Sequence, residues 1–313
     1  MPPRRQVEIV TTFLIGLREG LEAGAGLPEA LSRSAAGLPR EARERVRTAA
    51  RRLGGDYHED EWGFDEEFVR MVEPMFEVLY DRWWRVVTSG MANVPVHGRA
   101  LLAANHAGIL PWDAMMISLA IQREQTLPRH PRFLALNWAF ELPYVSVAIR
   151  KLGGVVASPH NALRLLEQDR LVAVFPEGVK GTGKPYRERY RLQRFGRGGF
   201  VEVALRTGAP IIPVAVVGSE EIYPKLGEAP MLARLLGAPF FPLTPTFPWL
   251  GPLGAVPLPS RWRIEFCEPI EMVGYGPAAV EDRSLVLELT ERVRDTIQAK
   301  LYENLVKRGP AFR

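Results

Sequence analysis

Residues 101–113 read LLAANHAGILPWD, and this stretch gives the clearest indication of the fold. It opens with small and aliphatic residues, a pattern typical of a short strand buried in a sheet. The run ends at Asn105 and His106, which would stand at the carboxyl end of the strand, where α/β sheets usually place their sites. Gly108 permits a tight turn, and Pro111 suits the first turn of a following helix.

Asp113 falls in the first turn of that expected helix, so its carboxylate can fold back toward His106. A histidine oriented by a carboxylate is the base half of a catalytic triad, and the missing hydroxyl can come from a substrate. The alternative is a loop histidine with ordinary hydrogen bonds and an aspartate that favours the helix dipole. A second motif has to decide between these two interpretations.

The composition is that of a globular protein. The 313 residues are 47% hydrophobic and 24% charged, with a formal net charge of +4. The single cysteine, Cys267, excludes an internal disulfide and sits in a strand-like setting, which favours inert packing in a reducing compartment. We find no cleavable signal peptide and no run of ~18–20 apolar residues, so a membrane-associated protein would have to lie on the bilayer.

Residues 1–60 are expected to form an N-terminal helical appendage, and residues 61–313 the main α/β domain. The appendage is rich in arginine between residues 33 and 52, which indicates a solvated helix face or, alternatively, a contact with anionic lipid headgroups. A helix is predicted over residues 64–88, kinked or split by Pro74. Trp83 and Trp84 near its end are of the kind found at membrane interfaces.

Apolar runs and amphipathic segments alternate along the rest of the chain, which predicts an α/β fold with a mostly parallel central sheet flanked by helices. Pro213 inside one strand favours a sheet edge or a bulge. Strands are expected at 101–104, 133–136, 155–157, 171–175, 211–217 and 262–266, and helices at 161–168, 199–207 and 280–305.

The second motif is FPEGVKGTGK, residues 175–184, at the end of another buried strand. Its glycines would let backbone N–H groups approach a ligand closely. From residue 180 to residue 197 the chain has seven cations and only one acid, Glu188. This density of positive charge favours a phosphate-bearing partner over a merely solvated loop. These cations are Lys180, Lys184, Arg187, Arg189, Arg191, Arg194 and Arg197.

Taken with residues 209–214, which read APIIPV, the two motifs resemble the ordered blocks of the glycerolipid acyltransferase superfamily over about residues 92–270. The resemblance implies that His106 is the base and Asp113 its carboxylate partner. It also implies that the block at Glu177 and Gly178 binds the acceptor. The candidate substrate-binding residues are therefore Asn105, Glu177, Gly178, Lys180, Lys184 and Arg187.

The sequence departs from the family pattern in three places. Six residues separate His106 from Asp113, where the family usually has four. The block after the third strand is ASPH at 157–160 and lacks the arginine often found there. After Gly178, the more common Thr-Arg-Ser is Val-Lys-Gly, and lysine keeps the charge but loses the forked geometry of arginine. The last two departures weaken the expectation of a phosphorylated acceptor.

Residues 235–260 carry no charge and have a proline every few positions, so they form no regular helix. Three interpretations stay open for this stretch: a loop folded over the core, a wall of an acyl-chain pocket, or a surface that enters the bilayer.

We therefore expect an O-acyltransferase that moves a fatty acyl group from acyl-CoA or acyl carrier protein to a glycerol-based or lysophospholipid hydroxyl. Its partners would be membrane lipids and the acyl donor, and its place the cytoplasmic face of a membrane, as a peripheral protein. No further cofactor, metal or nucleic acid is expected. The alternatives are a neutral lipid alcohol as acceptor, a hydrolase that uses the same histidine and aspartate, or a non-catalytic binder of anionic lipid.

Overall fold

The computed structural model describes residues 3–107, 110–142, 144–235, 237 and 240–312, so the expected turn at Gly108 lies outside the described residues. The chain divides into two compact units, Met1–Met71 and Val72–Arg313. The sequence placed this division after residue 60.

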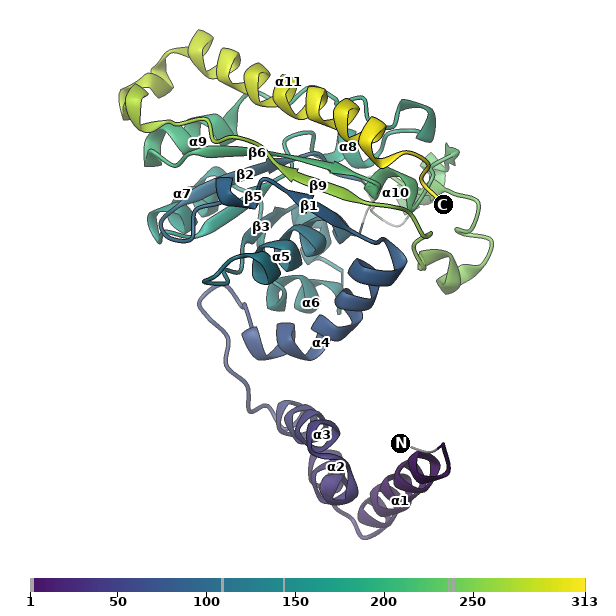
Figure 1. Ribbon diagram of the computed structural model, residues 1–313. Helices are drawn as coiled ribbons and strands as arrows, with labels where there is room; N and C mark the ends of the chain where they lie inside the picture. Colours follow the sequence, from purple (N-terminus) through teal and green to yellow (C-terminus); the bar gives the residue numbers. More distant parts are fainter. Residues whose placement is uncertain (1–2, 108–109, 143, 236, 238–239, 313) are drawn as a thin grey trace. The chain divides into compact units, whose positions relative to one another are not determined.

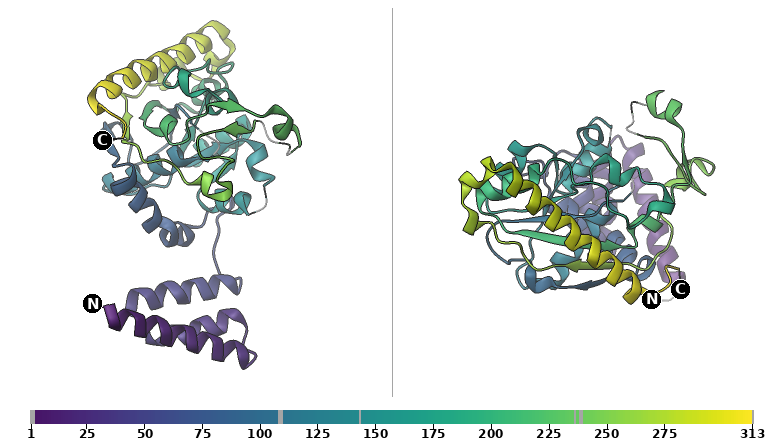
Figure 2. Two further views of the ribbon diagram at one scale, coloured as in Figure 1. Left: turned by 90° about the vertical axis from the view of Figure 1, so that its right-hand side faces the viewer. Right: turned by 90° about the horizontal axis from the view of Figure 1, so that it is seen from above.

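The first unit contains three helices, and α2 packs against both of the others (Figure 2). They are α1 (Pro3–Glu22), α2 (Leu27–Ser34) and α3 (Arg40–Leu53). Ion pairs explain why this unit extends past residue 60. The guanidinium of Arg52 lies 3.0 Å from Oδ1 of the fully buried Asp65, and Arg52 also pairs with Glu67. Arg52 thus belongs to a buried contact and not to a solvated basic face.

The second unit is built on a seven-stranded sheet in the order β1-β9-β6-β2-β5-β3-β4 (Figure 1). All neighbouring strands pair in parallel except β6 and β9, which pair antiparallel. The mostly parallel α/β fold is therefore confirmed. The strands are β1 (Val87–Ser89), β2 (Ala100–Ala104), β3 (Arg132–Ala135), β4 (Gly154–Val156), β5 (Leu171–Val174), β6 (Ile211–Val217) and β9 (Arg263–Phe266), and a separate pair is β7 (Gly227–Glu228) with β8 (Pro242–Leu243).

Helices cover both faces of the sheet. The long helix α11 crosses one face together with α9, and α5 and α6 lie against the other (Figure 1). The helices are α4 (Glu66–Val78), α5 (Trp112–Glu124), α6 (Val145–Lys151), α7 (Pro159–Glu167), α8 (Val179–Thr182), α9 (Gly199–Thr207), α10 (Pro230–Leu235) and α11 (Arg283–Arg308). Short 3₁₀ turns occur at Met91–Asn93, Asn137–Phe140, Tyr186–Glu188, Ser219–Glu221, Gly251–Ala255, Val273–Tyr275 and Pro277–Glu281.

The helix predicted over residues 64–88 is shorter than expected. It continues through Pro74 as α4 and passes at Leu79–Trp83 into a π-helical turn. The strand β1 then occupies Val87–Ser89, where the helix was expected to continue. A three-residue strand is too short to show an alternating pattern, so the sequence did not reveal it.

Pro213 lies in the interior strand β6, so its predicted place at a sheet edge is wrong. The pairing of β6 with the β9 segment changes register at this residue. Val214 pairs with Phe266 and Ile211 with Ile270, so two residues on one side face three on the other. Because the regular strand pairing is interrupted at this bulge, the pairing does not require the backbone N–H hydrogen bond that proline cannot donate.

Trp83 and Trp84 have opposite environments. Trp84 is fully buried and stacks on Trp262 with ring centroids 4.7 Å apart, and its indole N–H donates to the Leu258 carbonyl at 3.2 Å. The expected membrane contact through Trp84 is therefore wrong. Trp83 is 39% exposed and donates to the Pro257 carbonyl at 2.9 Å.

Cys267 is buried directly after β9, as the strand-like pattern predicted. Burial, reinforced by nearby Glu265, raises the pKa of its thiol to about 12, so the thiol stays protonated and inert. In the part of the chain that the structure describes, no helix is both long and apolar enough to cross a membrane.

Candidate active site

Three adjacent parallel strands deliver the polar residues of the site. In the sheet, β2 lies between β5 and β6, so the carboxyl ends of all three strands meet at one edge. His106 follows β2, Glu177 follows β5 and Glu220 follows β6. This is the edge at which open α/β sheets bind their ligands.

His106 and Asp113 are in direct contact. His106 Nδ1 lies 2.6 Å from Asp113 Oδ2, and the same carboxylate accepts the backbone N–H groups of Ala107 at 3.0 Å and Ala114 at 2.9 Å. Asp113 is fully buried in the first turn of α5. With Nδ1–H donated to this fixed carboxylate, Nε2 of the neutral imidazole is left as the acceptor.

The six-residue spacing preserves this contact because the longer loop is anchored by Trp112. The Trp112 ring packs edge-on against Trp84 and Phe76, with centroids 5.6 Å and 6.4 Å away. Its indole N–H donates to the Tyr223 hydroxyl at 3.0 Å. Trp112 thus joins the start of α5 to the core and to the neighbouring segment, while His106 and Asp113 stay in contact.

Asn105 was expected to bind substrate, but its side chain is fully buried and bonded to the backbone. Its amide donates to the Val216 carbonyl at 2.9 Å and accepts the Val216 N–H at 2.8 Å. Both polar atoms of the amide are therefore used to join the end of β2 to β6. Asn105 therefore holds the end of β2, and with it the backbone of His106, against β6.

Glu177 and Gly178 form the tight turn after β5. Gly178 has φ +57°, a backbone conformation that residues with a side chain rarely adopt. A Cβ atom on Gly181 would lie 2.6 Å from Cβ of Glu177. Gly181 therefore makes room for the glutamate, where the sequence predicted close approach to a ligand. Glu177 itself is buried and accepts the Gln193 N–H at 2.7 Å.

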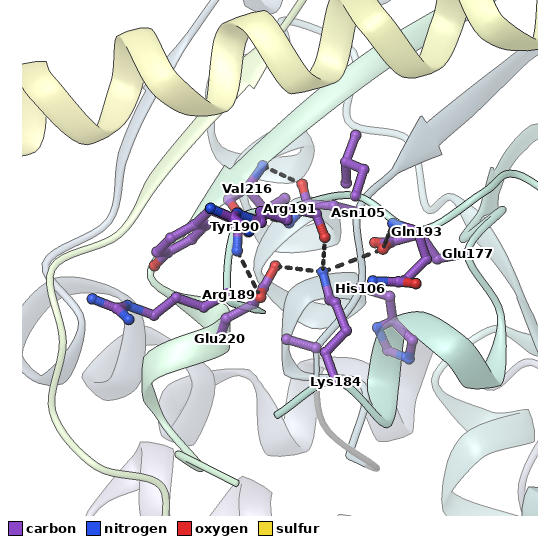
Figure 3. Close-up of polar contacts among 12 residues, drawn as sticks. Asn105, His106, Glu177, Lys184, Arg189, Tyr190, Arg191, Gln193, Val216 and Glu220 are labelled. Carbon is purple, nitrogen blue, oxygen red and sulfur yellow. Dashed lines mark hydrogen bonds and ion pairs between the residues drawn. The ribbon is translucent and has the colours of Figure 1, made fainter. Parts of the chain in front are cut away.

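Lys184 lies between two buried carboxylates (Figure 3). Its Nζ is 3.2 Å from Glu177 Oε2 and 3.1 Å from Glu220 Oε1, and it donates to the Arg191 carbonyl at 3.2 Å. Burial raises the pKa of Glu220 to about 7, although Lys184 and the Tyr190 N–H act in the opposite direction. We call Lys184, Glu177 and Glu220 the buried triad.

The candidate basic ligands do not form one phosphate site. Lys184 is used in the buried triad, whereas Lys180 is exposed on α8. The Arg187 side chain is 84% exposed and lies 3.8 Å from Glu188. Arg189 is also exposed, and its guanidinium lies over the Tyr186 ring at 4.4 Å.

Two cavities of about 250 Å³ each flank the loop that carries His106. His106 lines the first, which is otherwise almost wholly apolar and includes Phe133, Leu134, Ile149 and Phe175; we call it the apolar cavity. The second also has a mainly apolar surface, but charged side chains contribute to its wall, and we therefore call it the polar-walled cavity; its lining includes Ala107, Lys184, Arg189, Glu220, Tyr223, Lys225 and part of segment 240–255. Thr182 and Phe240 line both cavities and separate them.

Sequence reasoning missed Glu220. The signal was present, because Ser219, Glu220 and Glu221 directly follow the buried strand β6, in the same position that His106 has after β2. Nothing in the sequence, however, indicated that β6 is adjacent to β2. In the described residues no three metal-binding side chains come together.

Comparisons with known proteins show the family of the chain. A sequence model of the acyltransferase family matches residues 85–217, which contain His106, Asp113 and Glu177. The chain belongs to this family, and its resemblance to the glycerolipid acyltransferases is confirmed.

Its relatives include an uncharacterized protein of Mycobacterium tuberculosis, 51% identical over 83% of this chain and 73% of that protein. A protein from Bos taurus named "DGAT1/2-independent enzyme synthesizing storage lipids" is 25% identical over 69% of this chain and 59% of its own length. A 1-acyl-sn-glycerophosphate acyltransferase from Thermotoga maritima superposes with a TM-score of 0.47 at 20% identity, covering 97% of both chains.

Proposed function

We propose that this acyltransferase moves a fatty acyl group from a thioester, acyl-CoA or acyl-loaded carrier protein, to the hydroxyl of a glycerol-based lipid. The observation that carries the proposal is the contact between the buried Asp113 and His106, which lines the apolar cavity, while the next residue, Ala107, lines the polar-walled cavity. This contact presents one imidazole nitrogen as a base next to space for two substrates.

In the proposed reaction His106 Nε2 takes the proton of the acceptor hydroxyl as its oxygen attacks the thioester carbonyl. The new C–O bond forms, the C–S bond breaks, and the imidazolium returns the proton to the departing thiolate. Asp113 holds the imidazole in the required tautomer and stabilises its charged form. The acyl group passes directly between substrates, so no acyl-enzyme is required.

The two cavities differ in their lining residues, which supports a separate place for each substrate. Apart from His106, Thr182 and the indole of Trp138, the apolar cavity is lined by apolar side chains, glycine and proline, which suits an acyl chain. The polar-walled cavity adds hydroxyl and charged groups, which suit the head of an acceptor. We assign the acyl chain to the former and the acceptor to the latter.

The reaction itself is tested with oleoyl-CoA and a membrane lipid extract, followed by mass spectrometry of the lipids. We expect new oleoyl esters of glycerolipids with the wild type. Asp113→Asn should form them more slowly but still faster than His106→Ala, because the imidazole remains in place. Equal rates for the wild type and Asp113→Asn would remove the aspartate from the mechanism.

We further propose that the protein binds peripherally to the cytoplasmic face of a membrane. The contact is made by the described part of residues 226–255, which includes part of the wall of the polar-walled cavity and which we call the docking segment. This segment presents large apolar side chains that are each more than half exposed: Leu226, Met231, Leu235, Trp249, Leu250 and Leu253. The half-exposed Trp83, hydrogen-bonded to Pro257, continues this surface beside the exposed Arg82 and Arg85. Apolar insertion next to cations is the pattern of bilayer binding.

Replacing Met231, Trp249 and Leu253 together by serine should release the protein from anionic liposomes. Burial of one large apolar side chain contributes roughly 1.5–3 kcal/mol, so we expect binding to weaken at least about a hundredfold. The melting temperature should not change, because all three side chains are 70% exposed or more. Phe240 is unsuitable for this test because it is a buried wall of both cavities.

The matched control replaces Val273 and Val306 by serine, since they are similarly exposed but lie outside the docking segment. This control should bind liposomes like the wild type. Liposome binding by the triple variant at wild-type strength would show that the segment does not enter the bilayer.

A further inference from the structure

The ammonium group of Lys184 is engaged by the protein through two hydrogen bonds and one further ion pair. It carries three N–H donors. Three acceptors lie around it: Glu177 Oε2, Glu220 Oε1 and the Arg191 carbonyl, all at 3.1–3.2 Å. Lys184 lines the polar-walled cavity, so the cation best placed to hold an acceptor phosphate is already paired with two carboxylates of the protein itself.

The buried triad carries a surplus of negative charge. Two carboxylates share one ammonium, and Glu177 Oε1 has no hydrogen-bond partner among the described residues. All three side chains are at most 6% exposed, so water screens this charge poorly. A phosphate brought into the cavity would meet repulsion from this wall in place of a counter-ion.

The other cations at the cavity do not reverse this balance. Lys225 Nζ lies 2.6 Å from Glu228 Oε2 and 2.6 Å from the Gly183 carbonyl, so its charge is neutralised locally. Arg189 is exposed, and Figure 3 shows its guanidinium pointing away from Lys184 and His106. Neither of these two cations therefore offsets the negative charge of the buried triad.

From this charge arrangement we propose that the enzyme acylates an uncharged lipid alcohol, such as the free hydroxyl of a monoacylglycerol, and discriminates against phosphorylated acceptors. This inference rests on the proposed acyltransferase function and names its acceptor class. The cavity selects by repelling the phosphate, and its apolar walls and hydroxyl groups accommodate a neutral glyceride head.

The test compares 1-oleoylglycerol with 1-oleoylglycerol 3-phosphate as acceptors for oleoyl-CoA, at equal surface concentration in mixed micelles. The assay is run at about pH 8, above the pKa of about 7 of Glu220, so that the Glu220 carboxyl is ionised. We expect kcat/KM to be at least about tenfold higher for the neutral acceptor.

The decisive variant is Glu220→Gln, which removes the surplus charge and keeps the shape of the side chain. We expect the neutral-to-phosphorylated ratio of kcat/KM to fall by about tenfold, chiefly through a lower KM for the phosphorylated acceptor. Because the readout is a ratio, a general loss of activity in the variant cancels. The matched control, Glu188→Gln, makes the same charge change outside the cavity, on the loop that carries Lys184, and should keep the wild-type ratio.

The outcomes separate this inference from the proposed function. Transfer to both acceptors with equal or greater efficiency on the phosphorylated one would overturn the acceptor class and leave the acyltransferase function intact. Loss of that phosphate preference in Arg189→Gln would then identify Arg189 as the phosphate ligand. Failure to acylate either acceptor, or any hydroxyl in a lipid extract, would instead count against the proposed function.

Discussion

His106→Ala is expected to lower kcat for acyl transfer by about 10²–10⁴-fold, because a positioned general base contributes a factor of that size. The side chain is partly exposed at a loop and its partner Asp113 keeps two backbone N–H donors, so the variant should fold. The measurement is the initial rate of ester formation at saturating donor and acceptor.

His160→Ala is the control for this experiment. His160 is exposed in the first turn of α7 and lines neither cavity. Its replacement should leave kcat unchanged. A His106→Ala enzyme that turned over at the same rate as His160→Ala, with an unchanged melting temperature, would refute the assignment of the base.

Lys184→Met should destabilise the protein by about 3–5 kcal/mol, the usual cost of leaving buried charges without their partner. Its side chain is 4% exposed, and Glu177 and Glu220 would then face each other with no cation between them. The loss is measured by denaturant unfolding. Lys180→Met on the same loop is exposed and should change stability by no more than about 0.5 kcal/mol.

The pH dependence identifies the cause of this destabilisation. Without Lys184 the folded-state pKa of Glu220 is raised further, so folding takes up a proton and the destabilisation shrinks as pH falls below about 7. The double variant Lys184→Met, Glu220→Gln removes one of the two charges and should be more stable than Lys184→Met alone. A double variant that is less stable than the single one would contradict the charge account.

The sequence predicted the parts of the site that are local along the chain. His106 and Asp113 lie on a loop and the helix that follows it, so their contact depends only on the strand-loop-helix pattern. The mostly parallel sheet follows in the same way from alternating apolar runs. The resemblance to the acyltransferases added the expected roles.

What the sequence could not predict depends on strand order and on burial. Lys184 seemed a free cation because Glu220 lies 36 residues further on, and only the adjacency of β6 to β2 brings the two together. Trp83 and Trp84 are neighbours of the same type, yet a single step along a π-helical turn separates a half-exposed ring from a fully buried one. Asn105 next to the catalytic candidate seemed a ligand residue, but the adjacent strand takes both of its polar atoms.

The most direct test of the central claim, that His106 activates a lipid hydroxyl, is the balance between thiol release and ester formation. Purified protein is given labelled oleoyl-CoA with and without a glycerolipid acceptor, and free CoA thiol and labelled lipids are measured together. We predict that thiol release requires the acceptor, that each thiol is matched by one new lipid ester, and that His106→Ala abolishes both. Equal thiol release without acceptor, with the label in free fatty acid, would contradict the account and make the protein a thioester hydrolase.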